Sequence, residues 1–352
     1  MSAGQDSDIT IEFPCDGAVL NKHHGVETAQ GLKINLRGRA KSSTGIGVNG
    51  LNVFCADGSF DVGMELKEKF NEITLSSAFS KKTITVVWDR NSFRRYHFFI
   101  DDNIFFLTEI FRKSYKSIFE SFYLARLKKI HAQYGTKFVL NTFFRNDHEP
   151  FELSQFPGCY RKEWEDNADW LKLSFHAFSE FPGAPYRECS EERPCKLPLH
   201  YAQLREQVVR FAGENTFCPP SIIHFCDVAS PLSLKYLKDN GTIALGRKSL
   251  PGSAEKNQTD ITYDAGKGLF HMPVDLICNL CSMEQIRDVL EGCMAKSWKD
   301  TLNLGTHEQY CYPHYKNYMP DHFERIESAI RLLTENGFSP VFFHEGLLGN
   351  TK

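Results

Sequence analysis

The decisive stretch of the sequence is Arg94-Arg95-Tyr96-His97-Phe98-Phe99-Ile100-Asp101-Asp102-Asn103. Its apolar run stops at two adjacent carboxylates, Asp101 and Asp102. Two carboxylates so close ionise together at low cost only when a cation lies between them or when one keeps its proton. The stretch therefore predicts a buried strand that ends in a metal ligand next to a general base. The alternative is a strand that leads into a helix, with Asp102 or Asn103 as its N-cap.

The length and composition of the chain indicate a folded protein of more than one unit. The 352 residues suggest two domains, or one large barrel with an appendage. Hydrophobic residues make up 41% and charged residues 24%, which supports a packed core and argues against disorder. The net charge of −3 and the absence of a basic tract disfavour nucleic acid as a partner.

The cysteines and the apolar runs bear on the cellular compartment. The 11 cysteines follow no framework spacing, and Cys278 and Cys281 form a close pair without the second pair that a four-cysteine zinc site needs. We expect most of them to be reduced and buried, which favours a cytoplasmic location. The segment Met1–Thr10 is polar and acidic and has no signal-peptide core, and no run approaches the length of a membrane-spanning helix.

The first part of the chain, residues 1–92, is predicted to be a small all-β sandwich. Polar and apolar residues alternate in short runs, which is typical of sheets with one wet face. Turn signals such as Asn49-Gly50 and Asp57-Gly58 separate about seven such runs, and the segment resembles the immunoglobulin-like modules attached to carbohydrate-active proteins. The predicted strands include 9–13, 32–36, 71–75 and 83–88.

The second part, residues 93–352, alternates short apolar runs with amphipathic stretches. About eight such β/α repeats favour an α/β fold, a distorted (β/α) barrel of the TIM type. A doubly wound open sheet is the competing layout, but the chain has neither a Gly-x-Gly-x-x-Gly nor a Walker-type loop. The expected elements include a helix over 106–134 and strands over 137–142, 170–176, 221–225, 242–246, 301–305 and 340–344.

Polar groups follow nearly every predicted strand of this second part. In a β/α barrel the active site lies at the carboxyl ends of the strands. Side chains at those ends that can bind a metal or move a proton are Asp101, Asp102, Asn141, His176, His224, Asp227, Arg247, Asp275, His307, Glu308, His344 and Glu345. We expect this set to form a polar functional mouth, because burying so many unpaired charges without purpose is costly.

Two stretches add detail to this mouth. His176 and Glu180 are four residues apart, so a helical turn would let both face one ion, although an exposed loop with an incidental Glu fits equally well. The stretch that follows His307 holds four tyrosines, which suit stacking on sugar rings or simple packing of the loop. They are Tyr310, Tyr312, Tyr315 and Tyr318.

These motifs resemble the polysaccharide deacetylases of the NodB-homology superfamily. Phe99-Ile100-Asp101-Asp102 is similar to the family's first motif, in which the first Asp is the base and the second a metal ligand. His176-Ala177-Phe178-Ser179-Glu180 is similar to its second motif, with Glu180 where a second His belongs and Pro182 one position late. Val341-Phe342-Phe343-His344 is similar to the last motif, whose His is the general acid. Within the superfamily the chain looks most like divergent members encoded with surface-polysaccharide biosynthesis genes.

The resemblance implies a metal-dependent hydrolase that deacetylates a sugar or a polysaccharide precursor. Asp102, His176 and Glu180 would hold a divalent ion, with Asp101 as base and His344 as acid. Alternative ligands or substrate contacts are His224, Arg247, His307, Glu308, Tyr310 and Glu345. The mixed donor set suits Zn²⁺, Fe²⁺, Mn²⁺ or Co²⁺ without choosing among them.

Two other functions remain open at this point. One is a non-catalytic carbohydrate-binding or scaffold protein on a degenerate deacetylase barrel, which the altered second motif favours. The other is a glycoside hydrolase in which Glu308 and Glu345 form the carboxylate pair. The oligomeric state is left open.

Overall fold

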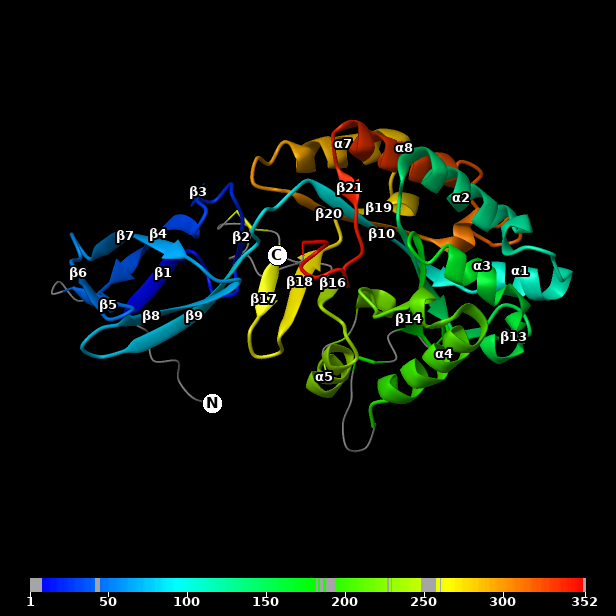
Figure 1. Cartoon of the computed structure of the whole chain (residues 1–352), viewed down its shortest axis with the longest axis horizontal. Helices are drawn as coiled ribbons and strands as arrows, with labels where there is room; N and C mark the ends of the chain where they lie inside the picture. The colour runs from blue at the N-terminus through cyan, green and yellow to red at the C-terminus, as the bar shows by residue number, and fades with distance from the viewer. Residues whose placement is uncertain are drawn as a thin grey trace.

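The computed structural model describes residues 8–41, 45–181, 183, 186–187, 194–226, 228, 230–247, 258–259 and 261–350. Pro182 and Asp227, singled out in the sequence, lie outside these residues. The elements form a β-rich part at the N-terminus and a larger part in which parallel strands alternate with helices (Figure 1). The expectation of an α/β chain with a parallel sheet is therefore confirmed.

Two sheets make up the β-rich part and enclose one apolar core. In β4 the residues Leu32, Ile34 and Leu36 face inward while Lys33 and Asn35 face solvent, as the alternating sequence predicts. The core includes Ile73 and Ile84 from the opposite sheet. One sheet has the order β1 (Ile9–Phe13), β4 (Leu32–Ala40), β3 (Val26–Glu27), with β7 (Ser59–Leu66) also paired to β4. The other has the order β2 (Val19–Leu20), β9 (Lys81–Trp88), β8 (Phe70–Ser76), β5 (Ile46–Val48), β6 (Leu51–Val53).

A seven-stranded parallel sheet organises the larger part. Its order is β15 (Phe217–Cys218), β14 (Leu171–Ala177), β11 (Phe138–Phe143), β10 (Arg95–Asn103), β20 (Thr301–His307), β19 (Leu276–Ile277), with β21 (Ser339–Pro340) paired to the start of β10. A separate sheet holds β16 (Ala244–Arg247), β18 (Leu269–Pro273) and β17 (Thr262–Asp264), and β12 (Arg145–Asn146) pairs with β13 (Phe151–Glu152). Backbone bonds from Gly246 N to Ser221 O and from Asp275 N to Asn303 O, both 2.8 Å, link the three-stranded sheet to the flanks of the parallel one.

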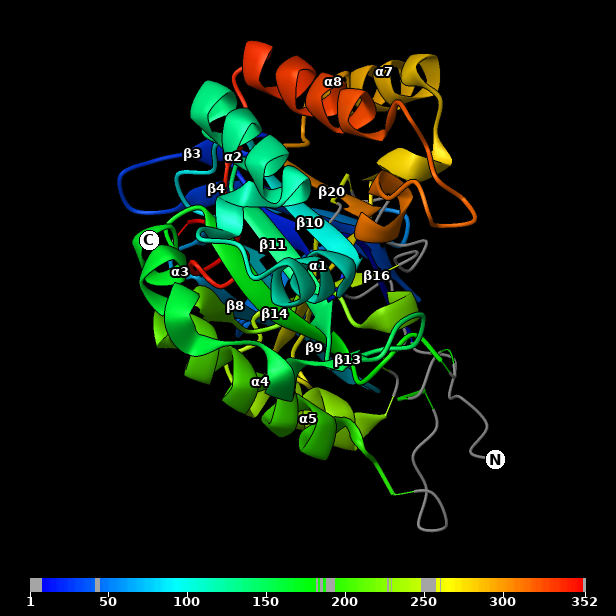
Figure 2. The same ribbon diagram turned by 90° about the vertical axis from the view of Figure 1, so that its right-hand side faces the viewer.

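Helices cover the outer face of the parallel sheet. Figure 2 shows α2, α7 and α8 on one side of the view and α3, α4 and α5 on the other, with the strands between them. The helices are α1 (Phe105–Lys113), α2 (Phe122–Tyr134), α3 (Arg161–Asp166), α4 (Leu197–Ala212), α5 (Pro231–Asp239), α7 (Met283–Met294) and α8 (His322–Glu335). None of the described helices is long and apolar enough to cross a membrane.

The two faces of β10 have different partners. Tyr96, Phe98 and Ile100 pack in the large core beneath the helices, whereas Phe99 belongs to a small inner cluster. Because side chains alternate along a strand, Phe99 and Asp101 share the inner face. That face leads to the carboxyl ends of β10, β14 and β20 and positions the polar residues found there.

Three expected elements differ from the structure. The single helix over 106–134 is wrong: α1 ends at Lys113, the next residue, Ser114, has a left-handed φ of 49°, and α2 starts at Phe122. The strand over 221–225 is wrong, because the chain there forms a turn, with a 3-10 segment at His224–Cys226. The strand over 340–344 is confined to Ser339–Pro340. All three segments contain buried apolar residues, and that apolar content alone did not identify their backbone conformation.

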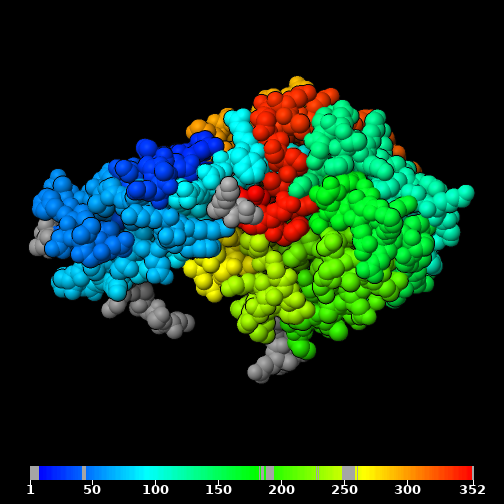
Figure 3. Space-filling view, viewed as in Figure 1, coloured from blue at the N-terminus to red at the C-terminus, as the bar shows by residue number. Residues whose placement is uncertain are grey.

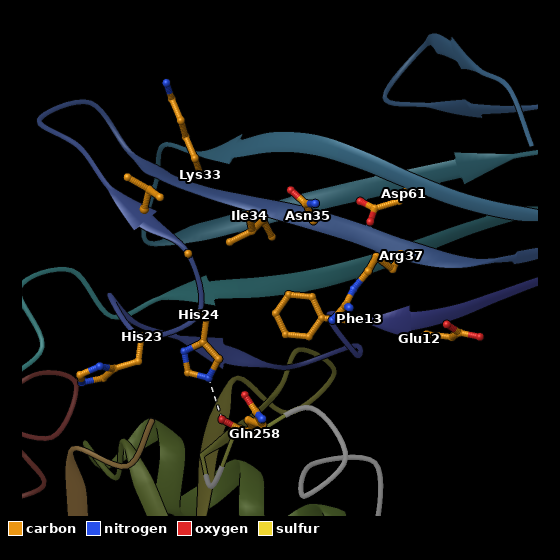
Figure 4. A pocket seen from close by; sticks show the side chains of 12 residues that line it. Glu12, Phe13, His23, His24, Lys33, Ile34, Asn35, Arg37, Asp61 and Gln258 are labelled. Carbon is orange, nitrogen blue, oxygen red and sulfur yellow. Dashed lines mark hydrogen bonds between the residues drawn. The ribbon is translucent and has the colours of Figure 1, made fainter. Parts of the chain in front are cut away.

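The two parts of the chain meet along a seam that contains both apolar packing and polar contacts. Val19 and Val87 from the β-rich part pack against Phe343, Leu347 and Leu348 near the C-terminus. In Figure 3 this red segment lies between the blue–cyan and the green regions. A cavity of about 590 Å³ also borders the seam (Figure 4). There, His24 Nε2 lies 2.6 Å from the backbone oxygen of Gln258.

Candidate metal centre

A bulge at the end of β10 brings both carboxylates to the same side. Pairing between β10 and β11 shifts register between Ile100 and Asn103, and Asp102 has a left-handed φ of 61°. Neighbouring side chains of a regular strand point to opposite faces. Here both Asp side chains approach His176: Asp101 Oδ1 lies 3.7 Å from its Nδ1 and Asp102 Oδ1 lies 3.2 Å from its Nε2. A positive φ in a non-glycine residue is a strained conformation that is found at functional sites.

Asn103 holds this bulge in place. Its side chain is fully buried, and its amide group donates to the backbone oxygens of Ile100 and Asn141, the latter at 3.1 Å. The amide oxygen accepts a bond of 2.8 Å from the hydroxyl of Tyr123 on α2. The side chain therefore ties the bulge to β11 and to a helix of the outer layer.

Three ligand atoms converge beside the bulge. Asp102 Oδ1 is 3.2 Å from His176 Nε2 and 3.5 Å from His224 Nδ1, and the two nitrogens are 3.1 Å apart. All three side chains are buried. We call this group, Asp102, His176 and His224, the trio. It joins residues from β10, β14 and the turn after β15.

The outer nitrogens of the two rings determine what the inner ones present. His176 Nδ1 lies 3.4 Å from the backbone oxygen of Ile222, and His224 Nε2 lies 3.3 Å from that of Glu180. A carbonyl oxygen only accepts, so in these two contacts the outer nitrogens carry the protons. The inner nitrogens then turn lone pairs toward each other and toward Asp102 Oδ1, which accepts no hydrogen bond from any described residue. Three converging acceptors without a shared proton fit a cation.

The spacing also fits a metal ion. Bonds of roughly 2.0–2.1 Å in a tetrahedral site place ligand atoms about 3.3 Å apart. The separations within the trio lie on either side of that value. Burial acts to raise the pKa of Asp102, but hydrogen bonds and positive charge from His176, His224 and His307 hold the pKa well below its usual range when these rings are protonated. When the inner nitrogens carry no proton, a bound cation would supply that positive charge.

Asp101 has the properties of a proton acceptor. Burial raises the pKa of Asp101 to about 7. The nearby His307 opposes this rise, and the charge of Asp102 reinforces it. Asn141 Nδ2 donates to Asp101 Oδ1 at 2.7 Å and fixes the carboxylate. A carboxyl group with a pKa near neutrality both takes up and releases protons efficiently at physiological pH.

His307 ends β20 directly beside Asp101, its register partner in the parallel pairing. Its Nδ1 lies 2.9 Å from Asn279 Oδ1, a contact that orients the ring. His307 lines the same cavity as Asp101 and the trio. It is therefore the histidine outside the trio that is placed to exchange a proton with a ligand in this cavity.

The cavity above these residues has a volume of about 680 Å³. It brings together eight of the residues singled out in the sequence: Asp101, Asp102, His176, Glu180, His224, His307, Tyr310 and Tyr315. Residues that the sequence reasoning did not assign to the site are Gln309 in the cavity wall, Asn279, which bonds to His307, and Asn103, whose bonds to the backbone of Ile100 and Asn141 hold the bulge at Asp102. The one available signal for Asn103 was a polar residue directly behind the Asp pair.

Glu180 lies in the cavity wall but outside the trio. Its Oε2 accepts a bond of 2.8 Å from Gln309 Nε2 and also contacts His148 Nε2. These contacts join the loop after β14 to the loops after β12 and β20. The third ligand of the trio, whose atoms lie 3.1–3.5 Å apart, is therefore His224 and not Glu180.

Of the described residues at the predicted strand ends, six do not line this cavity: Asn141, Arg247, Asp275, Glu308, His344 and Glu345. Glu308 is fully buried and caps α1: its carboxylate accepts the backbone N–H groups of Ile104 at 2.7 Å, Phe105 at 2.9 Å and Phe106. Burial raises the pKa of Glu308 to about 8, and the three N–H bonds oppose that rise. Arg247 Nε donates to His271 Nδ1 at 3.2 Å on the three-stranded sheet.

His344 and Glu345 lie at the opposite end of the strands. Glu345 pairs at 2.9 Å with Lys137, which precedes β11, and the ring of His344 stacks on Phe342 with centroids 5.2 Å apart. Burial lowers the pKa of His344 to about 4. The apolar run before His344 enters the inner cluster through Phe342 and does not extend β21 toward the cavity.

No protein-family model and no curated protein matches this sequence. Solved structures do resemble it. The Bc1960 peptidoglycan N-acetylglucosamine deacetylase is 11% identical with a TM-score of 0.40, over 73% of this chain and 89% of its own. The Xyl-CE4 domain of a multidomain xylanase from the hindgut metagenome of Trinervitermes trinervoides is 10% identical with a TM-score of 0.39, over 72% and 89%. BA3943, a CE4 family pseudoenzyme from Bacillus anthracis, is 9% identical with a TM-score of 0.36, over 72% and 66%. At 8–11% identity, these structural neighbours are of the polysaccharide deacetylase class that the sequence motifs resemble.

Proposed function

We propose that this chain is a metal-dependent hydrolase that removes an acyl group, such as acetyl, from a sugar or a polysaccharide precursor. The observation that supports it most is the convergence of Asp102, His176 and His224, with unprotonated inner atoms, beside a carboxyl group of raised pKa. A divalent ion held there would polarise the acyl carbonyl and lower the pKa of a bound water. Two nitrogen ligands and one oxygen ligand suit Zn²⁺, Fe²⁺, Mn²⁺ or Co²⁺.

The residues around the trio would move the protons. Asp101, held by Asn141, would accept the proton of the attacking water. His307, held by Asn279, would protonate the leaving amine or alcohol. This replaces His344 as the proposed acid and Glu180 as the proposed third ligand. Tyr310 and Tyr315 in the wall offer rings for stacking on a sugar.

The proposal extends to the architecture. We infer that the parallel and the three-stranded sheet together form a distorted barrel, supported by the backbone bonds at Gly246 and Asp275. We likewise infer that residues 1–92 form a separate immunoglobulin-like domain and residues 93–352 the catalytic one. The separate core of the β-rich part supports the division.

The test is the metal content of protein purified without chelator, read together with acetate release from acetylated sugars. We expect about one equivalent in the wild type, because the trio is a single set of three protein ligands that leaves a fourth position for water, and loss of metal in Asp102→Ala and His224→Ala. Glu180→Ala is the control and should keep the metal. A wild type that binds none of the four ions after incubation would refute the proposal.

A non-catalytic glycan-binding protein is the second candidate, favoured by one observation. Glu180, which stands where the resembling motif has its second His, is engaged by Gln309 and His148. Retained glycan binding without metal or acetate release would establish it. The glycoside hydrolase reading has less support, because neither Glu308 nor Glu345 lines the cavity.

A further inference from the structure

The cavity that holds the trio is lined by both polar and apolar side chains. The polar ones include Glu180, Gln309 and Tyr310. Four apolar ones are Phe99, Val274, Ile277 and Leu280, which we call the apolar wall. A ligand that fills this space therefore meets polar groups and apolar surface beside the metal ligands.

The apolar wall begins directly next to the chemistry. Phe99 precedes Asp101 by two residues on the same face of β10 and is 1% exposed. It packs with Val139 and Ile222 beneath the cavity, and its ring fills the space over Gly305, where a Cβ would lie 2.1 Å from it. Val274 and Ile277 pack against this same cluster and are only partly buried, so part of each side chain faces the cavity.

Exposed apolar side chains line the same cavity. Leu280 is 71% exposed, Phe225 is 52% exposed and Phe181 is 56% exposed, and all three line it. Single exposed apolar residues are ordinary on protein surfaces. Three large ones that line one cavity together with the apolar wall indicate a surface that receives an apolar group.

We infer that the acyl group removed by this site is a hydrocarbon chain of several carbons, longer than acetyl. This inference rests on the proposed function. The chain lies along Phe99, Val274, Ile277 and Leu280, and the polar carrier, a sugar amine or hydroxyl, contacts the polar residues of the lining. A cavity of about 680 Å³ is in the range that encloses a drug-sized ligand, far more than an acetyl group occupies.

The reaction is a hydrolysis and needs no oxidant or reductant. The oxygen of water forms a bond to the acyl carbon, and the bond from that carbon to the nitrogen or oxygen of the carrier breaks. One proton of the water goes to Asp101 and His307 supplies one to the leaving group. The products are an alkanoate and the free amine or alcohol.

The first experiment compares chain lengths in a series of N-acylglucosamines from acetyl to octanoyl. Each methylene that enters the apolar wall should raise kcat/KM roughly threefold to fourfold until the wall is covered. The second measurement follows binding alone: calorimetric titration with acetate, butanoate, hexanoate and octanoate should show the same trend in affinity.

A matched pair of variants locates the effect. Leu280→Ser removes an exposed leucine from the wall and should flatten the dependence of affinity on chain length. Leu199→Ser removes a leucine that is 58% exposed on α4 and does not line the cavity, so the dependence should stay.

The outcomes separate this inference from the proposed function. Acetyl as the best substrate, or an affinity that does not rise with chain length, overturns the inference even if hydrolysis occurs. A rising affinity without hydrolysis of any member supports the apolar chain site and counts against the hydrolase. An unchanged slope in Leu280→Ser would place the chain elsewhere and overturn the assignment.

Discussion

Replacing Asn103 with Ala tests whether the bulge in β10 creates the metal site. The side chain is fully buried and makes three hydrogen bonds, to the backbone oxygens of Ile100 and Asn141 and to the hydroxyl of Tyr123. At about 1 kcal/mol net for each bond, Asn103→Ala should lower the free energy of unfolding by about 3 kcal/mol. Because Asp102 then loses the support of its left-handed conformation, the affinity for Zn²⁺ should fall about 10-fold to 100-fold, as is usual when a partner behind a ligand is removed.

Urea denaturation measures the first effect, and competition with a fluorescent chelator measures the second. Asn146→Ala is the matched control, because Asn146 is also buried and bonds to Thr108 Oγ1 at 2.9 Å and to His148 N at 2.9 Å, away from the bulge. It should cost stability and leave the affinity for Zn²⁺ within about threefold, under 1 kcal/mol. A stable Asn103→Ala protein with wild-type affinity would refute the reasoning that this side chain supports the bulge.

Four further results are expected. Glu308→Ala should lower the free energy of unfolding by about 3 kcal/mol in urea denaturation, because three buried N–H groups at the start of α1 lose their acceptor; a loss below about 1 kcal/mol would contradict this. His307→Gln should reduce kcat about 10²-fold to 10⁴-fold in the hydrolysis assay and keep the metal content; loss of metal would make His307 a ligand instead. Burial lowers the pKa of His97 to about 3, so below pH 6.5 the unfolded state binds more protons than the folded state. Acidification should therefore lower the free energy of unfolding by up to about 1.4 kcal/mol per pH unit through this group. His97→Asn should remove that slope. Removal of the metal with a chelator should lower the melting temperature, since an ion at 100 times its Kd contributes about 2.7 kcal/mol; identical melting curves would show that the folded state binds no ion.

The sequence was informative where strands end in polar residues. The runs ending at Asp101, His176 and His307 are strands of one parallel sheet, so their ends meet at one edge. The prediction of an α/β chain with such a sheet is confirmed by the topology. The order of the strands in this sheet is what places the three residues together.

The remaining features depend on backbone conformations that the hydrophobic periodicity of the sequence does not predict. A strict alternation would have turned Asp102 away from Asp101, and the left-handed residue that reverses this leaves no mark in the pattern. The run Val341–Phe343 is apolar because it packs against the inner face of the sheet, not because it is a strand that delivers His344 to the cavity. His224 reaches the trio from a turn, and no periodic pattern in the sequence predicts the backbone conformation of that turn.

The seam near the C-terminus has a consequence for biosynthesis on the ribosome. Leu347 and Leu348 pack against Val87, and Asn350 Nδ2 donates to Asp89 Oδ1 at 2.9 Å. At roughly 5–20 residues per second, translation supplies those last side chains on the order of tens of seconds after Val87 has left the tunnel. During that interval the nascent chain exposes part of an apolar edge, which Ala244, Phe270 and Met272 cover earlier and the final segment covers last. Trigger-factor-like holdases should therefore bind this edge on stalled nascent chains that end before residue 340, and release it once the last segment has emerged.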